Sequence, residues 1–192
     1  MRFYHGKMEF EIPESVYEPR EDSLLLAEAL ERLKLADKKV LEVGCGSGFL
    51  SILAAKKKAA VTSVDINPEA VRITKENAAK NGIKIEAAQS DLFSSVNKTF
   101  DIIIFNPPYL PVEEGETDAI YSGGKTGRET VERFVDQAEN HLNPGGIILL
   151  LISSLTGEKE VIELFEKRNM KASAIMREKV PWEELIVLEC QR

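Results

Sequence analysis

The chain has 192 residues, a net charge of −7 at pH 7 and a hydrophobic content of 43%. This length and composition predict one globular domain over residues 1–192, and the acidic balance disfavours tight, sequence-independent binding to nucleic acid. The sequence has no apolar run long enough to span a membrane and no signal-peptide core, and two cysteines are too few for a disulfide framework, so the cytoplasm is the expected location.

Strand-like and helix-like patterns alternate along the chain, which is typical of an α/β fold. Strands are predicted at Lys39–Val43, Ala60–Asp65, Lys84–Ala88, Asp101–Phe105 and Ile147–Ile152. Helices are predicted at about Glu21–Leu33, Gly48–Lys57, Pro68–Lys80, Arg128–Leu142 and Glu158–Arg168. Most of the strands are apolar and end at a polar or glycine residue, as buried parallel strands do.

The pattern changes after Met170, where no further helix separates the predicted strands. The segments Lys171–Arg177 and Leu185–Cys190 flank the dipeptide Pro181-Trp182 and predict an antiparallel pair at a sheet edge. The first 16 residues show no clear pattern and receive no assignment.

A glycine-rich segment, Glu42 to Gly48, follows the first predicted strand and precedes a helix. Glycines let the backbone turn tightly against a ligand, and the helix start offers free N–H groups. The spacing is G-x-G-x-G rather than the G-x-G-x-x-G of dinucleotide folds, and Glu42 would be poorly placed beside a pyrophosphate. An acid there suits a ligand with an ammonium or sulfonium charge, which favours S-adenosylmethionine.

Acidic residues also follow the next two predicted strands. Asp65 stands where nucleoside-binding α/β domains place a carboxylate for the ribose hydroxyls. Asp91 could accept from the adenine amino group, and the Leu92 N–H could donate to the ring. Taken singly, Asp65 fits the start of a helix equally well, and Asp91 fits a turn. Ligands of open α/β sheets bind at the carboxyl ends of strands, however, and four polar side chains stand at such ends: Glu42, Asp65, Asp91 and Asn106.

The tetrapeptide Asn106-Pro107-Pro108-Tyr109 directly follows the apolar run Ile102–Phe105. Its two prolines stiffen the loop. The Asn106 oxygen and the Pro107 carbonyl could accept the two hydrogens of an NH2 group, while a planar group lies on Tyr109. A lone Asn-Pro dipeptide would be an ordinary turn at the end of a strand. Beside a methyl donor, the tetrapeptide instead indicates methylation of an amide or amino nitrogen.

These motifs occur in the order found in class I S-adenosylmethionine methyltransferases, and the chain resembles the HemK family of protein glutamine methyltransferases. Val16–Ser23 and Gly123–Glu129 resemble the short eukaryotic and archaeal branch, which acts on class I release factors. The resemblance implies a Rossmann-like seven-stranded sheet, mostly parallel with an antiparallel last strand and with helices on both faces. It also implies methyl transfer to the glutamine side-chain amide of a Gly-Gly-Gln motif, with S-adenosylhomocysteine as the product.

The resemblance gives the matching residues their roles. The residues implied to hold the cofactor are Ser23, Glu42, Gly44, Gly46, Asp65, Asp91, Leu92 and Asn106. The substrate would lie on Asn106, Pro107, Pro108 and Tyr109, of which Asn106, Pro107 and Tyr109 would be catalytic.

Other residues carry weaker signals. No metal site is expected, because His5 and His141 lack the spacing of metal ligands. Cys45 is expected to be a small packing residue rather than a reactive thiol. The segment Gly123–Glu129 could be either a lid or the start of a helix.

A protein partner is implied as well. Close relatives pair with a small zinc-binding activator subunit. In this fold the predicted strand Lys84–Ala88 would lie at the edge of the sheet, where a strand of another chain can add.

Three other functions stay open on the sequence. An adenine-N6 methyltransferase acting on DNA or RNA could use a similar tetrapeptide, because a flipped base poses the same geometric problem. A protein lysine methyltransferase could admit an amine to the same position, although Asn106 suits a planar amide better. A noncatalytic binding subunit could keep the fold, but the intact set of acids with Asn106 disfavours that interpretation.

Overall fold

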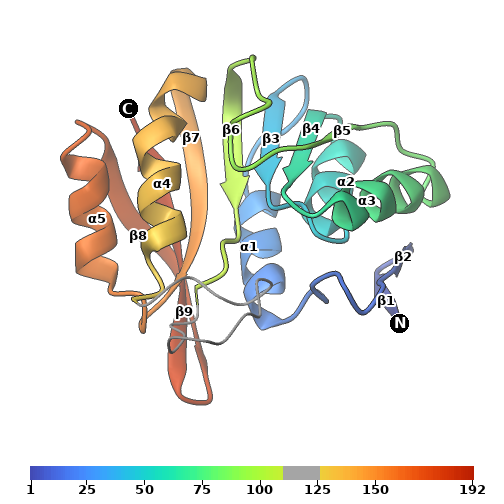
Figure 1. Cartoon of the computed structure of the whole chain (residues 1–192), viewed down its shortest axis with the longest axis horizontal. Helices are drawn as coiled ribbons and strands as arrows, with labels where there is room; N and C mark the ends of the chain where they lie inside the picture. The colour runs from blue at the N-terminus through green and yellow to red at the C-terminus, as the bar shows by residue number, and fades with distance from the viewer. Residues whose placement is uncertain (110–125) are drawn as a thin grey trace.

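The computed structural model describes residues 1–109 and 126–192. Within them, a seven-stranded sheet has the order β5-β4-β3-β6-β7-β9-β8 (Figure 1). In that order the strands are β5 (Glu86–Gln89), β4 (Ala60–Asp65), β3 (Lys39–Val43), β6 (Phe100–Phe105), β7 (Leu142–Ser153), β9 (Glu183–Gln191) and β8 (Lys171–Val180). The first five are parallel, and β9 is antiparallel to both of its neighbours. The predicted α/β sheet with an antiparallel last strand is therefore confirmed.

Alternate residues of the strands pack against opposite faces of this sheet. In β6, Ile102 and Ile104 join one buried cluster, while Ile103 and Phe105 join the other. Burial on both faces requires apolar side chains at successive positions, which explains the uninterrupted apolar run in this strand.

Helices supply the apolar side chains that cover the two faces. The first face is covered by α1 (Glu21–Glu31), α2 (Phe49–Lys56) and α3 (Pro68–Lys80), and the second by α4 (Glu129–Ala138) and α5 (Glu158–Glu166). No helix in the described part of the chain is long and apolar enough to cross a membrane.

A hairpin of β1 (Arg2–His5) and β2 (Met8–Glu11) precedes the sheet and was not predicted from the sequence. The rings of Phe3 and Phe10 pack on Phe49, with centroids 5.2 and 5.6 Å from the Phe49 centroid. The Asn77 side chain of α3 also accepts from the N–H of Glu11 and donates to its carbonyl. Partners distant in sequence therefore hold the hairpin.

Several boundaries differ from the prediction. β5 begins at Glu86 instead of Lys84, because its pairing with β4 starts opposite Thr62. α4 ends at Ala138, and a 3₁₀ turn over Glu139–His141 leads directly into β7. β7 is longer than predicted because Leu142 already pairs with Phe100.

The strand order reverses at β3. The chain runs outward from β3 through β4 to β5, and then crosses to the other side of β3 to form β6. Open α/β sheets bind ligands at the carboxyl ends of the strands beside such a reversal. The loops that follow β3, β4 and β6 meet at this point.

Candidate active site

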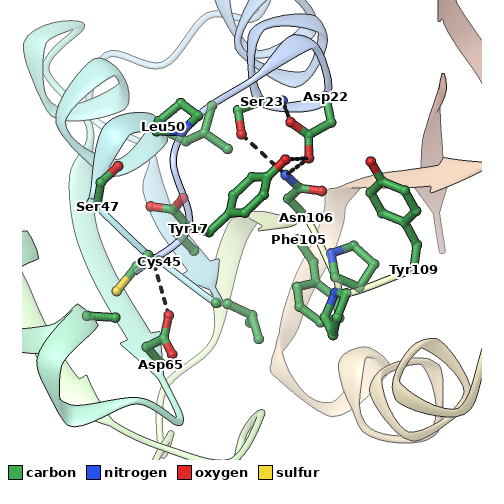
Figure 2. Close-up of a pocket in the computed structure, with 18 of the residues that line it drawn as sticks. Tyr17, Asp22, Ser23, Cys45, Ser47, Leu50, Asp65, Phe105, Asn106 and Tyr109 are labelled. Carbon is green, nitrogen blue, oxygen red and sulfur yellow. Dashed lines mark hydrogen bonds between the residues drawn. The ribbon is translucent and has the colours of Figure 1, made fainter. Parts of the chain in front are cut away.

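A cavity of about 930 Å³ opens at the carboxyl ends of the parallel strands. This volume is at the upper end of the range of pockets that hold small molecules, about 300–1,000 Å³. Its walls come from the start of α1, the loops after β3, β4, β5 and β6, and the tip of the β8–β9 hairpin. Figure 2 shows side chains from several of these segments pointing into it.

The glycine-rich loop after β3 turns back sharply to start α2. Gly46 and Gly48 have φ angles of 50° and 79°, in the left-handed region that side chains other than glycine disfavour. A Cβ on Gly48 would also lie 3.0 Å from the side chain of Thr74. The Thr74 hydroxyl in turn donates to the Gly46 carbonyl over 3.1 Å, so α3 holds the loop in this shape.

Asp65 ends β4 and binds the loop of the neighbouring strand. One of its carboxylate oxygens accepts from the Gly46 N–H and the other from the Asn67 N–H, each over 2.9 Å. Burial raises the pKa of the Asp65 carboxyl. Because each carboxylate oxygen has a second lone pair, both can still accept from the ribose hydroxyls of a nucleoside. The shape of the loop and the position of the acid are thus fixed together.

Glu42 lies on the cavity wall but is almost completely buried. One of its oxygens accepts from both the N–H and the hydroxyl of Ser51, at the start of α2. The Ser51 and Ser63 hydroxyl oxygens are 2.5 Å apart, so Glu42, Ser51 and Ser63 form a buried row of hydrogen-bonded side chains. Burial raises the pKa of Glu42 to about 8. A cationic ligand beside it would favour the ionised form and lower that pKa.

Asp91 and Leu92 line the cavity after β5. One Asp91 carboxylate oxygen pairs with the Arg133 guanidinium of α4 over 2.5 Å, and both side chains are about half-exposed. Leu92 is buried and has a φ of 48°, an uncommon conformation for a leucine. Arg133 was not predicted to be near the site, because only the packing of α4 on the sheet places it there.

The Asn106 side chain is oriented by the first turn of α1. Its Nδ2 donates to an Asp22 carboxylate oxygen over 2.9 Å, and a longer contact of 3.4 Å reaches the Ser23 hydroxyl. An ionised carboxylate can only accept hydrogen bonds, so the nitrogen end of the amide must face Asp22. The oxygen then points away from α1, and Asn106 Oδ1 is buried without a hydrogen-bond partner among the described residues.

Two residues of this arrangement, Asp22 and Tyr17, were not predicted from the sequence to have a role. The Tyr17 hydroxyl donates to the same Asp22 oxygen over 2.9 Å, and burial together with Asp22 raises the pKa of Tyr17. Both lie in the Val16–Ser23 segment that carries the family resemblance. An acid in the first turn of a helix is usually explained by the helix dipole, so only the fold shows that Asp22 contacts Asn106.

The prolines and the tyrosine of the tetrapeptide also line the cavity. In Figure 2, Asn106 lies between Tyr17 and Tyr109. The Tyr109 ring is partly buried, which raises the pKa of its hydroxyl. The predicted site residues from Ser23 to Tyr109 therefore line one cavity, while their roles stay predictions. Residues 123–125 of the predicted Gly123–Glu129 loop lie outside the described residues.

The residues with weaker signals have packing contacts. The His141 ring stacks on Phe93 with centroids 4.6 Å apart, and the His5 ring meets the edge of Phe49. Cys45 is buried, and burial raises the pKa of its thiol. Across residues 1–109 and 126–192, no group of three or more His, Cys, Asp or Glu side chains is arranged to hold a metal ion.

The chain is similar to known methyltransferases. The model of the methyltransferase small domain family matches residues 18–175. A protein of Methanocaldococcus jannaschii, assigned as a candidate protein N5-glutamine methyltransferase, is 47% identical over 92% of this chain and 92% of its own length.

Two solved structures share the fold. The Mtq2 subunit of the E. cuniculi Mtq2–Trm112 complex, which methylates the translation termination factor eRF1, is 30% identical with a TM-score of 0.78, over 93% of this chain and 99% of its own. The T. thermophilus 16S rRNA N2 G1207 methyltransferase, solved with AdoMet and guanosine, is 26% identical with a TM-score of 0.73, over 100% of this chain and 50% of its own.

Proposed function

The chain belongs to the methyltransferase small domain family and, within it, to the protein N5-glutamine methyltransferases, and on that premise we propose that it methylates a peptide chain release factor. The methyl group of S-adenosylmethionine is transferred to the side-chain amide nitrogen of the glutamine in the Gly-Gly-Gln motif. The two core clusters share one sheet, which supports the proposal that the chain works as a single catalytic domain.

The observation that carries this proposal is the side-chain oxygen of Asn106, which has no hydrogen-bond partner in the part of the chain that the structure describes. A buried carbonyl oxygen without a donor costs about 1–3 kcal/mol, so natural proteins seldom leave one unpaired without a reason. Asn106 Oδ1 is such an atom, and Asp22 fixes its direction. The NH2 group of a glutamine side chain supplies the missing donor and brings its nitrogen to the cavity that the predicted cofactor residues line.

The cofactor residues fit a nucleoside with a sulfonium group. Asp65 would accept from the ribose hydroxyls, and Asp91 with the Leu92 N–H would bind the adenine edge. The Glu42 carboxyl lies buried at the base of the glycine-rich loop, where it would favour a positively charged ligand. When bound, S-adenosylmethionine supplies an electrophilic methyl group: the carbon–sulfur bond breaks as the carbon–nitrogen bond forms, and the sulfonium becomes a neutral thioether.

The amide nitrogen of the substrate glutamine is a poor nucleophile, and Asn106 and Pro107 are the residues that would promote its reaction. The lone pair of an amide nitrogen is delocalised, so the reaction depends on aligning that nitrogen with the methyl group, an effect that can contribute about 7–11 kcal/mol. The Asn106 oxygen and the Pro107 carbonyl would accept from the two N–H groups and so hold the nitrogen in line. They also stabilise the positive charge that develops on it, and the proton leaves after methyl transfer.

We also propose a small zinc-binding activator subunit as a partner, docked at the edge strand β5. Within the described residues, β5 pairs only with β4 and forms one end of the sheet. The Mtq2 protein was solved in complex with a second protein, Trm112. Co-expression with the activator of the source organism should raise solubility or activity, and unchanged values of both would contradict the proposal.

Mass spectrometry tests the reaction directly. A release factor with a Gly-Gly-Gln motif is incubated with the chain and S-adenosylmethionine, and one methyl group is expected on the glutamine. A methyl group on lysine, or on adenine in a parallel assay with DNA and RNA, would identify one of the alternative functions instead.

A matched pair of variants tests the role of Asn106. Asn106→Ala should lower kcat by about 100-fold or more and leave the cofactor Kd within a few fold, because it removes one acceptor at the reacting nitrogen. Asn143 donates to Asp101 over 2.9 Å in a similar Asn–Asp contact at the other end of β6, so Asn143→Ala is the control and should keep kcat. Weaker cofactor binding with normal turnover at saturation would contradict the assignment.

A further inference from the structure

The β8–β9 hairpin extends past the carboxyl ends of the parallel strands and carries the turn Pro181-Trp182 at its tip (Figure 1). Val180, Pro181 and Glu183 line the cavity beside the tetrapeptide. The tip therefore forms part of the rim of the active site. None of its residues has a role in the mechanism described above.

Trp182 combines two unfavourable features. It is 95% exposed to solvent, although a large aromatic side chain is normally at least half buried. Its φ is 78°, in the left-handed region that costs a bulky residue about 1–2 kcal/mol. Within residues 1–109 and 126–192, this side chain contributes almost no packing. Trp182 does not itself line the cavity, but it stands between Pro181 and Glu183, which do, and strain together with exposure at this place indicates a residue that serves binding rather than stability.

Glu183 has an unpartnered oxygen of its own. Across the described residues, the buried side-chain oxygen and nitrogen atoms without a hydrogen-bond partner are Asn106 Oδ1 and Glu183 Oε2. Both residues line the same cavity. The negative charge of Glu183 also acts on Tyr109 of the tetrapeptide and contributes to the raised pKa of that hydroxyl. The cavity lining thus includes two acceptor oxygens without a donor among the described residues, Asn106 Oδ1 just after β6 and Glu183 Oε2 at the start of β9.

We propose that Trp182 and Glu183 bind the backbone of the protein substrate next to the target glutamine. This inference rests on the proposed function for the identity of the substrate. Glycines beside the glutamine present peptide planes without side chains, and an indole can lie flat on such a plane. Glu183 then accepts a hydrogen bond from a backbone N–H of the same segment. The hairpin tip binds the peptide backbone, while Asn106 binds the side-chain amide.

The test uses fluorescence, because Trp182 is the single tryptophan of the chain. A tryptophan-free peptide with a Gly-Gly-Gln motif is titrated into the protein, and the emission should shift to shorter wavelength as the indole leaves water. A peptide with the glutamine kept and both glycines replaced by valine should bind at least about tenfold more weakly.

Trp182→Gly separates binding from stability. Glycine removes the strain at this φ, so the melting temperature should stay the same or rise, while the peptide Kd should increase by about tenfold. Tyr4, a 60% exposed aromatic residue of β1, a strand with no residue in the cavity lining, gives the control Tyr4→Ala, which should leave the peptide Kd unchanged. Glu183→Ala should also weaken binding, and Glu183→Gln, which keeps an acceptor, should restore most of the lost affinity.

The outcomes distinguish this inference from the proposed function. A fluorescence shift without methyl transfer would support the docking site and refute the proposed reaction. Methyl transfer with unchanged emission and a normal peptide Kd for Trp182→Gly would refute the docking site and leave the reaction intact. Equal losses in Glu183→Ala and Glu183→Gln would show that the donor is a cationic side chain, and would refute a backbone contact.

Discussion

Replacing Asp22 with asparagine should reverse the orientation of the Asn106 amide without changing the shape of the side chain at position 22. In the wild type, the Ser23 N–H donates to Asp22 Oδ1 over 2.6 Å, while Asn106 and the Tyr17 hydroxyl both donate to Oδ2. An asparagine has one oxygen and one NH2 group for these two positions. The Ser23 N–H belongs to the backbone and cannot turn away, so the oxygen of the new asparagine stays at the δ1 position, where it accepts from this N–H.

The new NH2 group would then face Asn106, whose own amide must turn so that its oxygen accepts. In the other arrangement, Asn106 keeps its wild-type orientation and the asparagine at position 22 turns its NH2 group toward the Ser23 N–H. This arrangement loses one hydrogen bond, worth about 0.5–1.5 kcal/mol, and places two N–H donors against each other, which costs about 1–3 kcal/mol. Together these costs come to about 1.5–4.5 kcal/mol, and even a total of about 2 kcal/mol would leave only about 3% of the molecules in the wild-type orientation. The substrate would meet an NH2 group instead of the Asn106 oxygen in all other molecules.

We therefore expect Asp22→Asn to lower kcat by about 30-fold or more, with the cofactor Kd and the far-UV spectrum almost unchanged. Asp101 gives a matched control, because its carboxylate also accepts from a backbone N–H, of Lys39, and from an asparagine side chain, of Asn143. Asp101→Asn should leave kcat unchanged. A kcat for Asp22→Asn within threefold of the wild type would refute the orientation argument.

Three further substitutions test the cofactor end of the site. Asp65→Ala should weaken S-adenosylmethionine binding by about tenfold or more, since it removes an acceptor for the ribose and the contact to Gly46; unchanged affinity by calorimetry would exclude this role. The pKa of Glu42 rises from 4.5 to about 8 on folding, so the free energy of unfolding falls as the pH rises through this range. Glu42→Gln should therefore make the free energy of unfolding, measured with urea, depend less on pH. Parallel pH curves for the variant and the wild type would contradict this prediction. Gly48→Ala should reduce the free energy of unfolding by about 1–3 kcal/mol, because its Cβ would lie 3.0 Å from Thr74 at a positive φ, and an equal urea midpoint would contradict this.

The sequence predicted best the elements whose ends carry local signals. α3 begins and ends as predicted, because the Asn67 side chain accepts from the Glu69 N–H and Asn81-Gly82 closes the helix. The N-terminal hairpin was missed because its strands are short and depend on Asn77 and Phe49, which are remote in the sequence. Local patterns cannot reveal such partners.

The same division applies to the candidate site. Glu42, Asp65 and Asn106 each lie at or next to the carboxyl end of a parallel strand, so their position in the sequence alone predicted that they meet. Asp22 and Glu183 line the cavity from a helix start and a hairpin tip, whose location depends on how these elements pack on the sheet. Side chains that orient a site are therefore harder to predict than side chains that follow its strands.

The orientation of the Asn106 oxygen also affects the release of the methylated product. Methylation replaces one N–H group of the glutamine amide with a methyl group, so the product has a single donor for a site with two acceptors. One acceptor would face a methyl group and lose its partner, which costs about 1–3 kcal/mol. The product should therefore bind about 10- to 100-fold more weakly than the substrate. The geometry that selects an unmodified amide thus promotes product release and limits each glutamine to one methyl group.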